Sequence, residues 1–237
     1  MGFHAYLQRH NIPFESVLAK GANNRMFTRI KAEAVRATKE LAVERGECPD
    51  GVGSGVRNAH LLAVAPNASS SIICGNTSPS IEPYRANAFT QKTKSGSSLL
   101  KNEYLEHALD EIDQNTDEVW KSIITNGGSC QHLDFLDDYT KEVFKTAVEI
   151  DQRWIIELAG DRQKHICQSQ SLNIFFPADV AKQELHAIHM MAWKQGVKTL
   201  YYLRSEAMKR AETVSDEALR AYMFDSIDEN ACLACEG

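Results

Sequence analysis

Two residue pairs in this chain have side chains that can carry electrons. Tyr201 and Tyr202 are adjacent, and phenols in contact can pass an electron while handing a proton to a partner. Cys232 and Cys235 form a C-x-x-C motif near the last residue, a spacing that allows a disulfide to form and exchange. Each pair also has a plainer interpretation. Neighbouring tyrosines on a strand point to opposite faces, one buried and one exposed, and the cysteines could be half of a zinc site or a chance pair in a disordered tail. A structural zinc ion needs four ligands, and this pair supplies only two.

A run of small residues, PNASSS at 66–71, could bind an anion. Such a run can begin a helix, whose free N–H groups and positive dipole end attract negative charge. Serine hydroxyls would add donors, and an alanine would let a phosphate approach closely. Taken alone, the run is more often a plain serine-rich turn.

The elements around these motifs alternate between helix and strand, which favours an α/β fold. Apolar spacing and glycine stops predict helices at 26–45, 138–159 and 178–195, and one or two acidic helices within 103–126. Phe3, Tyr6 and Leu7 look like the inner face of another helix. Strands are expected at 58–66, 171–176 and 197–203, a loop at 47–57, loop or extended chain at 84–100, and a short helix within 205–225.

The composition is that of an ordinary globular protein. The 237 residues carry a net charge of −6 and no basic face or tail, which argues against nucleic-acid binding. No apolar run approaches the roughly 18 residues of a membrane span, and the first residues lack a signal-peptide core. We therefore expect a cytoplasmic protein (host cytoplasm if encoded by a phage). There a disulfide framework is unexpected, and four cysteines stay without a role: Cys48, Cys74, Cys130 and Cys167.

Four segments, in this order, resemble the large (catalytic) subunit of class I ribonucleotide reductases. They are PNASSSIICGNTSPSIEPY at 66–84, QSQSLN at 168–173, WKQGVKTLYYL at 193–203, and the terminal cysteine pair. The chain departs from the family pattern at four positions. Asn67 and Ser70 replace threonines, Ile72 replaces glutamine, and Cys167 stands where aspartate is usual.

The resemblance implies a role for each motif. The first segment would form the cradle for the substrate diphosphate, and the tyrosines would relay a radical from the small subunit to the active-site cysteine, Tyr201 being the inner one. The tail cysteines, Cys232 and Cys235, would reduce the active-site disulfide and be reduced in turn by thioredoxin or glutaredoxin. The cradle positions that match are Pro66, Ala68, Ser69 and Ser70.

The resemblance also implies a fold and partners. Residues 1–225 would form the later part of a ten-stranded α/β barrel, and 226–237 a flexible redox-active tail. The family's radical cysteine and substrate-reducing cysteines are not found, so we expect inactivity until an N-terminal piece of the large subunit joins. A split subunit of the phage kind and a shortened longer chain both stay open. The radical cofactor, of the diiron or a related metal type, would be held by the small subunit, and this chain would bind no cofactor itself. The small subunit would dock on helices 138–159 and 178–195.

Two rival functions stay open. The chain could be a non-catalytic remnant that only binds the small subunit, although intact tyrosines and tail cysteines argue against decay. It could also be a free-standing thiol–disulfide protein. That class places its C-x-x-C near a first βαβ unit rather than at the terminus.

Overall fold

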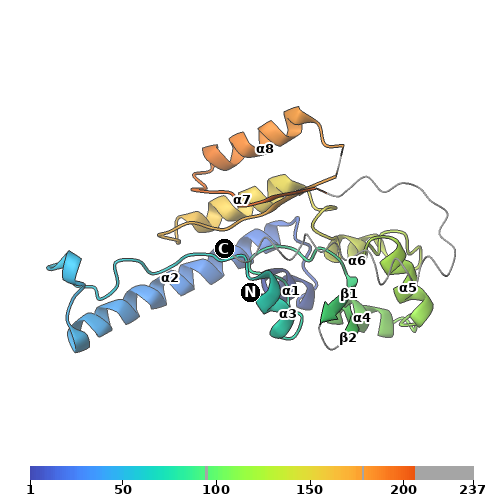
Figure 1. Cartoon of the computed structure of the whole chain (residues 1–237), viewed down its shortest axis with the longest axis horizontal. Helices are drawn as coiled ribbons and strands as arrows, with labels where there is room; N and C mark the ends of the chain where they lie inside the picture. The colour runs from blue at the N-terminus through green and yellow to red at the C-terminus, as the bar shows by residue number, and fades with distance from the viewer. Residues whose placement is uncertain (94–95, 178, 206–237) are drawn as a thin grey trace.

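The computed structural model describes residues 1–93, 96–177 and 179–205, so the expected helix within 205–225 and the tail lie outside it (Figure 1). Two hydrophobic clusters organise the described chain, one around the long helices and one around the hairpin. The helices are α1 Phe3–Arg9, α2 Val17–Arg45, α3 Ala68–Ile73, α4 Glu103–Asp110, α5 Asp117–Thr125, α6 Asp138–Val143, α7 Gln152–Gln163 and α8 Lys182–Lys194, with a 3-10 turn η1 at Pro49–Gly51. The strands are β1 Ala88–Thr93, β2 Gly96–Lys101, β3 Ile174–Phe176 and β4 Leu203–Ser205.

The larger core lies between three stacked helices and the strand β3. Helix α7 packs against α2 on one side and α8 on the other, as Figure 1 shows. Phe3 and Leu7 of α1 are buried in this core, as expected, whereas Tyr6 stacks on His10 at the surface, so its predicted inward position is wrong. Helix α2 begins earlier than predicted because Ser16 caps it, its hydroxyl accepting from the Ala19 N–H at 3.0 Å.

A two-stranded parallel sheet and one isolated bridge lie among the motifs. Strand β3 pairs with β4, with Ile174 opposite Leu203, and Val64 forms a single parallel bridge with Gln170 on the other side. The α/β class is thus confirmed, and the barrel is not closed within the described residues.

All three predicted strands are shorter in the structure, and 171–176 is reduced to β3 at Ile174–Phe176. Residues 58–66 supply only the bridge at Val64, because side chains take several of the neighbouring backbone N–H groups. Cys167 Sγ accepts from the Leu61 and Leu62 N–H groups. Residues 197–203 reach β4 only at Leu203, because Val197 N–H still closes the end of α8 by donating to the Ala192 carbonyl.

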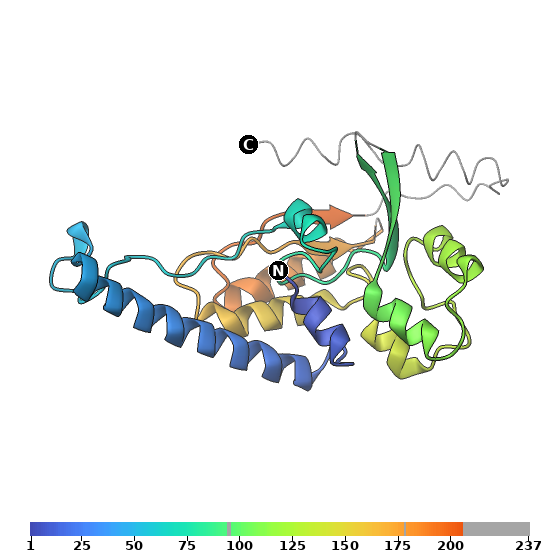
Figure 2. The same ribbon diagram turned by 90° about the horizontal axis from the view of Figure 1, so that it is seen from below.

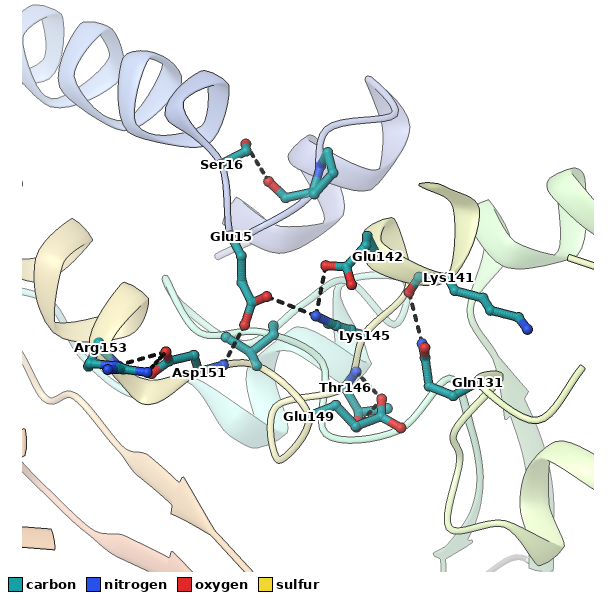
Figure 3. Close-up of polar contacts among 12 residues, drawn as sticks. Glu15, Ser16, Gln131, Lys141, Glu142, Lys145, Thr146, Glu149, Asp151 and Arg153 are labelled. Carbon is teal, nitrogen blue, oxygen red and sulfur yellow. Dashed lines mark hydrogen bonds and ion pairs between the residues drawn. The ribbon is translucent and has the colours of Figure 1, made fainter. Parts of the chain in front are cut away.

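The predicted helix 138–159 is in fact two helices, and this prediction was wrong. Glu149 accepts from the Thr146 N–H at 2.7 Å and from its hydroxyl at 2.8 Å, which turns the chain. Asp151 then caps α7, and Glu15 holds the turn by pairing with Lys145 at 2.9 Å and accepting from the Asp151 N–H (Figure 3). Side chains that compete for backbone N–H groups interrupt a helix even when the apolar spacing continues.

The smaller core joins the antiparallel hairpin β1–β2 to helices α4, α5 and α6. Figure 2 shows the hairpin projecting beside these helices, on the side away from α2. The prediction of one or two acidic helices within 103–126 is confirmed as two, α4 and α5. No helix among the described residues is long and apolar enough to cross a membrane.

Candidate functional site

The predicted phosphate cradle forms the first turn of α3. Asn67 precedes the helix in the left-handed conformation, with φ 52°, and Ala68, Ser69 and Ser70 are exposed. The N–H groups of a first helical turn have no acceptor within the helix. Ser71, in contrast, donates its hydroxyl to the Ala68 carbonyl at 2.7 Å. The first turn therefore offers backbone N–H groups and two serine hydroxyls on an accessible surface.

The rest of this segment folds back and is anchored to the N-terminal helix. Thr77 N–H donates to the Ser71 carbonyl at 3.1 Å, and Gly2 N–H to the Ser78 carbonyl at 2.8 Å. The Ser78 hydroxyl accepts from the Ala5 N–H at 3.1 Å. The segment thus reaches Glu82 as an ordered, buried turn.

Glu82 joins this segment to the QSQSLN motif. Its carboxylate accepts two hydrogen bonds from Asn173, one from the backbone N–H at 2.8 Å and one from Nδ2 at 3.1 Å. Burial raises the pKa of Glu82 above its ordinary value, and the Asn173 hydrogen bonds and then the charges of Arg204 and Arg85 only partly oppose this. Two motifs that are 91 residues apart in sequence are thus fixed to each other through a carboxylate that is only 3% exposed.

Asn173 in turn holds the tyrosine pair. Its Oδ1 accepts from the Tyr202 N–H at 3.1 Å, and the Tyr201 N–H donates to the Leu172 carbonyl at 2.8 Å. The tyrosine segment therefore lies along residues 172–174, held by backbone and side-chain bonds.

The two tyrosine rings contact each other, with centroids 4.2 Å apart and planes tilted by 50°. The plainer interpretation, one buried and one exposed tyrosine on opposite strand faces, is wrong, because the regular strand begins only at Leu203. The Arg204 guanidinium lies over the Tyr202 ring at 5.0 Å. Tyr201 is 48% exposed and Tyr202 is half-buried. Cys232 and Cys235 lie outside the described residues.

A buried arginine that the sequence interpretation missed anchors the same motif from below. Arg162 Nε donates to Gln170 Oε1 at 2.7 Å, and its Nη1 donates to Asn23 Oδ1 at 2.9 Å. Burial lowers the pKa of Arg162 to about 9. The available signal was its spacing, since Arg162 follows Ile155 and Leu158 on the apolar face of α7.

Cys167 sits where it can act as an acceptor. Its sulfur accepts from the Leu61 N–H at 3.1 Å and the Leu62 N–H at 3.2 Å. Burial alone would raise the pKa of this thiol, but the hydrogen bonds from the two backbone groups outweigh it and lower the pKa. The sulfur thus receives the bonds that a carboxylate at this position could accept. Among the described residues, no group of three or more His, Cys, Asp or Glu could hold a metal ion.

The parallel strands, their covering helices and the motif loops joined at their ends define part of an α/β-barrel protein. Residues 49–203 match the family described as "Ribonucleotide reductase, barrel domain", and the chain belongs to this family.

Relatives and a solved structure point to the same part of one subunit. The chain is 47% identical over 235 residues to the ribonucleoside-diphosphate reductase large subunit of Invertebrate iridescent virus 6, covering 97% of this chain and 24% of that protein. It is 34% identical over 268 residues to the large subunit of Caenorhabditis elegans, covering 95% and 34%. The Actinobacillus ureae class Id ribonucleotide reductase alpha subunit superposes with a TM-score of 0.81 at 40% identity, covering 87% of this chain and 38% of that one. The chain therefore spans well under half of these relatives and corresponds to a C-terminal portion of the large subunit.

Proposed function

We propose that this chain is part of the catalytic subunit of a ribonucleotide reductase and takes part in reducing ribonucleoside diphosphates to deoxyribonucleotides by radical chemistry. The observation that carries the proposal is the contact between the rings of Tyr201 and Tyr202. The pair is fixed through Asn173 and Glu82 to the segments 168–173 and 66–84. Its position is therefore set by the same segments that carry the family resemblance.

The first turn of α3 would bind the substrate diphosphate. Ser69 and Ser70 present hydroxyl donors, Ala68 leaves room for a phosphate oxygen, and Pro66 sets the entry to the turn. Hydrogen bonds to a charged acceptor are roughly twice as strong as neutral ones. The exposure of this turn fits a site that is completed by other parts of the subunit.

The tyrosine pair would relay the radical. Each step moves one electron between neighbouring phenols, and a proton moves with it, so neither ring has to carry a lasting charge. Ring contact keeps that electron step short. In this proposal Tyr201 passes the radical to the active-site cysteine and Tyr202 receives it from the side of the small subunit.

The partners follow from this role. The small subunit would supply the radical from its diiron-type or related metal cofactor, and an N-terminal piece of the large subunit would supply the radical cysteine. Helix α8 is a better docking candidate than α7. Trp193 on α8 is 72% exposed, and Met190 and Met191 of the same helix line a hollow of about 490 Å³, whereas α7 is largely buried. Cys232 and Cys235 would deliver electrons from thioredoxin or glutaredoxin, in the cytoplasm.

The test is reduction of a ribonucleoside diphosphate by this chain alone and after addition of the missing large-subunit piece and the small subunit. We expect activity only in the complete mixture. Tyr201→Phe in that mixture should abolish turnover while leaving assembly intact, because phenylalanine keeps the ring and removes the oxidisable hydroxyl. Appreciable turnover by Tyr201→Phe would refute the relay. A correctly assembled wild-type mixture without activity would favour the remnant that only binds the small subunit.

A further inference from the structure

Glu82 is a buried carboxylate that none of the proposed chemical steps uses. It is 3% exposed and lies near the end of the cradle segment, away from the serines at its start. Glu82 accepts two hydrogen bonds from Asn173, and Asn173 in turn accepts one from the Tyr202 N–H. A buried charge is costly unless it is paired or hydrogen-bonded. A carboxylate buried at this position therefore indicates a role for its hydrogen bonds.

The ionised carboxylate fixes which way the Asn173 amide points. A carboxylate can only accept hydrogen bonds, whereas an amide has a donor end and an acceptor end. With Nδ2 donating to Glu82, Oδ1 must face the Tyr202 N–H, which is the arrangement observed. A flipped amide would present a donor to the Tyr202 N–H, and both bonds would be lost.

We propose that Glu82 is a positioning residue for the radical-relay tyrosines: it orients the Asn173 side chain, which in turn fixes the backbone of Tyr202 and hence the contact between the rings. This inference rests on the proposed function, since the position of the pair matters for turnover only if the pair relays a radical. The contacts that carry it are the three bonds that join Glu82, Asn173 and Tyr202.

Glu82→Gln separates charge from shape. The introduced glutamine cannot accept both Asn173 bonds, because one end of its amide is now a donor that faces another donor. If Asn173 flips to satisfy it, the bond to Tyr202 is lost. Adding Asn173→Asp restores both hydrogen bonds, with the donor and acceptor between positions 82 and 173 exchanged. The introduced glutamine would then accept from the backbone N–H of residue 173 and donate to the introduced aspartate, whose second oxygen accepts from the Tyr202 N–H.

The readout is the environment of Tyr202 in the full chain. We would place 3-fluorotyrosine at position 202 and record its ¹⁹F NMR signal in wild type, Glu82→Gln, the Glu82→Gln/Asn173→Asp double variant and Asn87→Asp. Asn87 is a matched control, because its buried amide donates to the Gly128 and Phe144 carbonyls in the other hydrophobic cluster. It should weaken the fold without touching the tyrosines.

We expect Glu82→Gln to shift or broaden the signal, the double variant to restore it, and the control to leave it unchanged. A wild-type signal in Glu82→Gln, no restoration in the double variant, or an equal shift in the control would each overturn the proposal. If Glu82→Gln does not fold, the double variant decides: a wild-type signal supports the proposal and a displaced one refutes it.

Turnover of the assembled reductase gives the second readout. Glu82→Gln should lower kcat about tenfold or more, since small misplacements of reacting groups are costly, and should leave the KM for the diphosphate unchanged. The double variant should recover most of kcat. A raised KM with unchanged kcat would contradict a positioning role at the tyrosines. If the wild-type mixture is inactive, the proposed function fails, and the fluorine signals still decide whether Glu82 positions Tyr202.

Discussion

Single buried polar side chains hold distant segments of this chain together. Glu82 joins the cradle segment to Asn173, Arg162 anchors Gln170, and His4 receives the N–H of Tyr84 on its Nδ1 at 2.9 Å. Each of these groups is almost fully removed from solvent. Their hydrogen bonds therefore persist in a low dielectric, where losing one partner leaves the other unsatisfied and costs about 1–3 kcal/mol.

His4 makes the stability of the chain depend on pH. Burial lowers the pKa of His4 from 6.5 to about 3, and a backbone contact with Val143 only partly opposes this. Between these pH values the unfolded chain binds a proton that the folded chain refuses. The stabilising contribution is thus complete above pH 6.5 and is lost as the pH falls toward 3, by up to about 1.4 kcal/mol per unit.

The matched variant is His4→Asn, whose side-chain oxygen can accept from the Tyr84 N–H but does not titrate. Urea unfolding at about pH 7.5 and about pH 5 should show the wild type losing about 2 kcal/mol more than the variant over this interval. Equal losses in the two proteins would show that His4 is protonated in the folded chain or is not buried.

At the scale of elements, short helices and turns position the motif residues. Helix α3 places its serines on an exposed first turn, and the turn between α6 and α7 is fixed by Glu149, Glu15 and the Asp151 cap (Figure 3). The longer helices α2, α7 and α8 pack against one another in the larger core.

The exposed turn of α3 predicts different effects for neighbouring serines. In the assembled reductase, Ser69→Ala and Ser70→Ala should each raise the KM for the diphosphate by about tenfold, the value of one hydrogen bond to a charged group. Ser71→Ala is the control, because its hydroxyl is already bonded to the Ala68 carbonyl. Steady-state kinetics of the three variants checks this. A KM that rises equally in all three would mean that the turn is disturbed as a whole.

Two helical glycines should respond in opposite ways to alanine. A Cβ at Gly160 in α7 would lie 2.9 Å from Gln195 Cβ, so Gly160→Ala should push α8 away and cost about 1–3 kcal/mol. At Gly21 in α2 the nearest atom is the mobile end of Arg25, so Gly21→Ala should stabilise by about 0.5–1 kcal/mol. Thermal unfolding of both variants measures the difference. A stabilised Gly160→Ala would contradict the close approach of α7 and α8, and a destabilised Gly21→Ala would show that Arg25 does not move aside.

At the scale of the whole molecule, the described chain is a partial barrel with two cores. Within it, the parallel strands have an open edge at β4 and a single bridge at Val64, and a strand edge presents unpaired backbone groups that another strand can satisfy. This fits the small share of the relatives' length that the chain covers. The expected dependence of activity on a further large-subunit piece therefore has a structural counterpart in the incomplete sheet.

The sequence alone determined the α/β class, the helices α4, α5 and α8, and the grouping of motifs that marks the family, because these depend on local spacing and residue type. It could not show that Glu82, Asn173 and Tyr202 meet, that residues 138–159 break at Thr146, or that Arg162 lies under Gln170. Those features depend on hydrogen bonds between segments far apart in the chain, and such bonds leave no periodic pattern for a single sequence to display. Tertiary structure decided them because most buried polar groups are stable only when a partner is within hydrogen-bond distance, and here the partners come from distant parts of the chain.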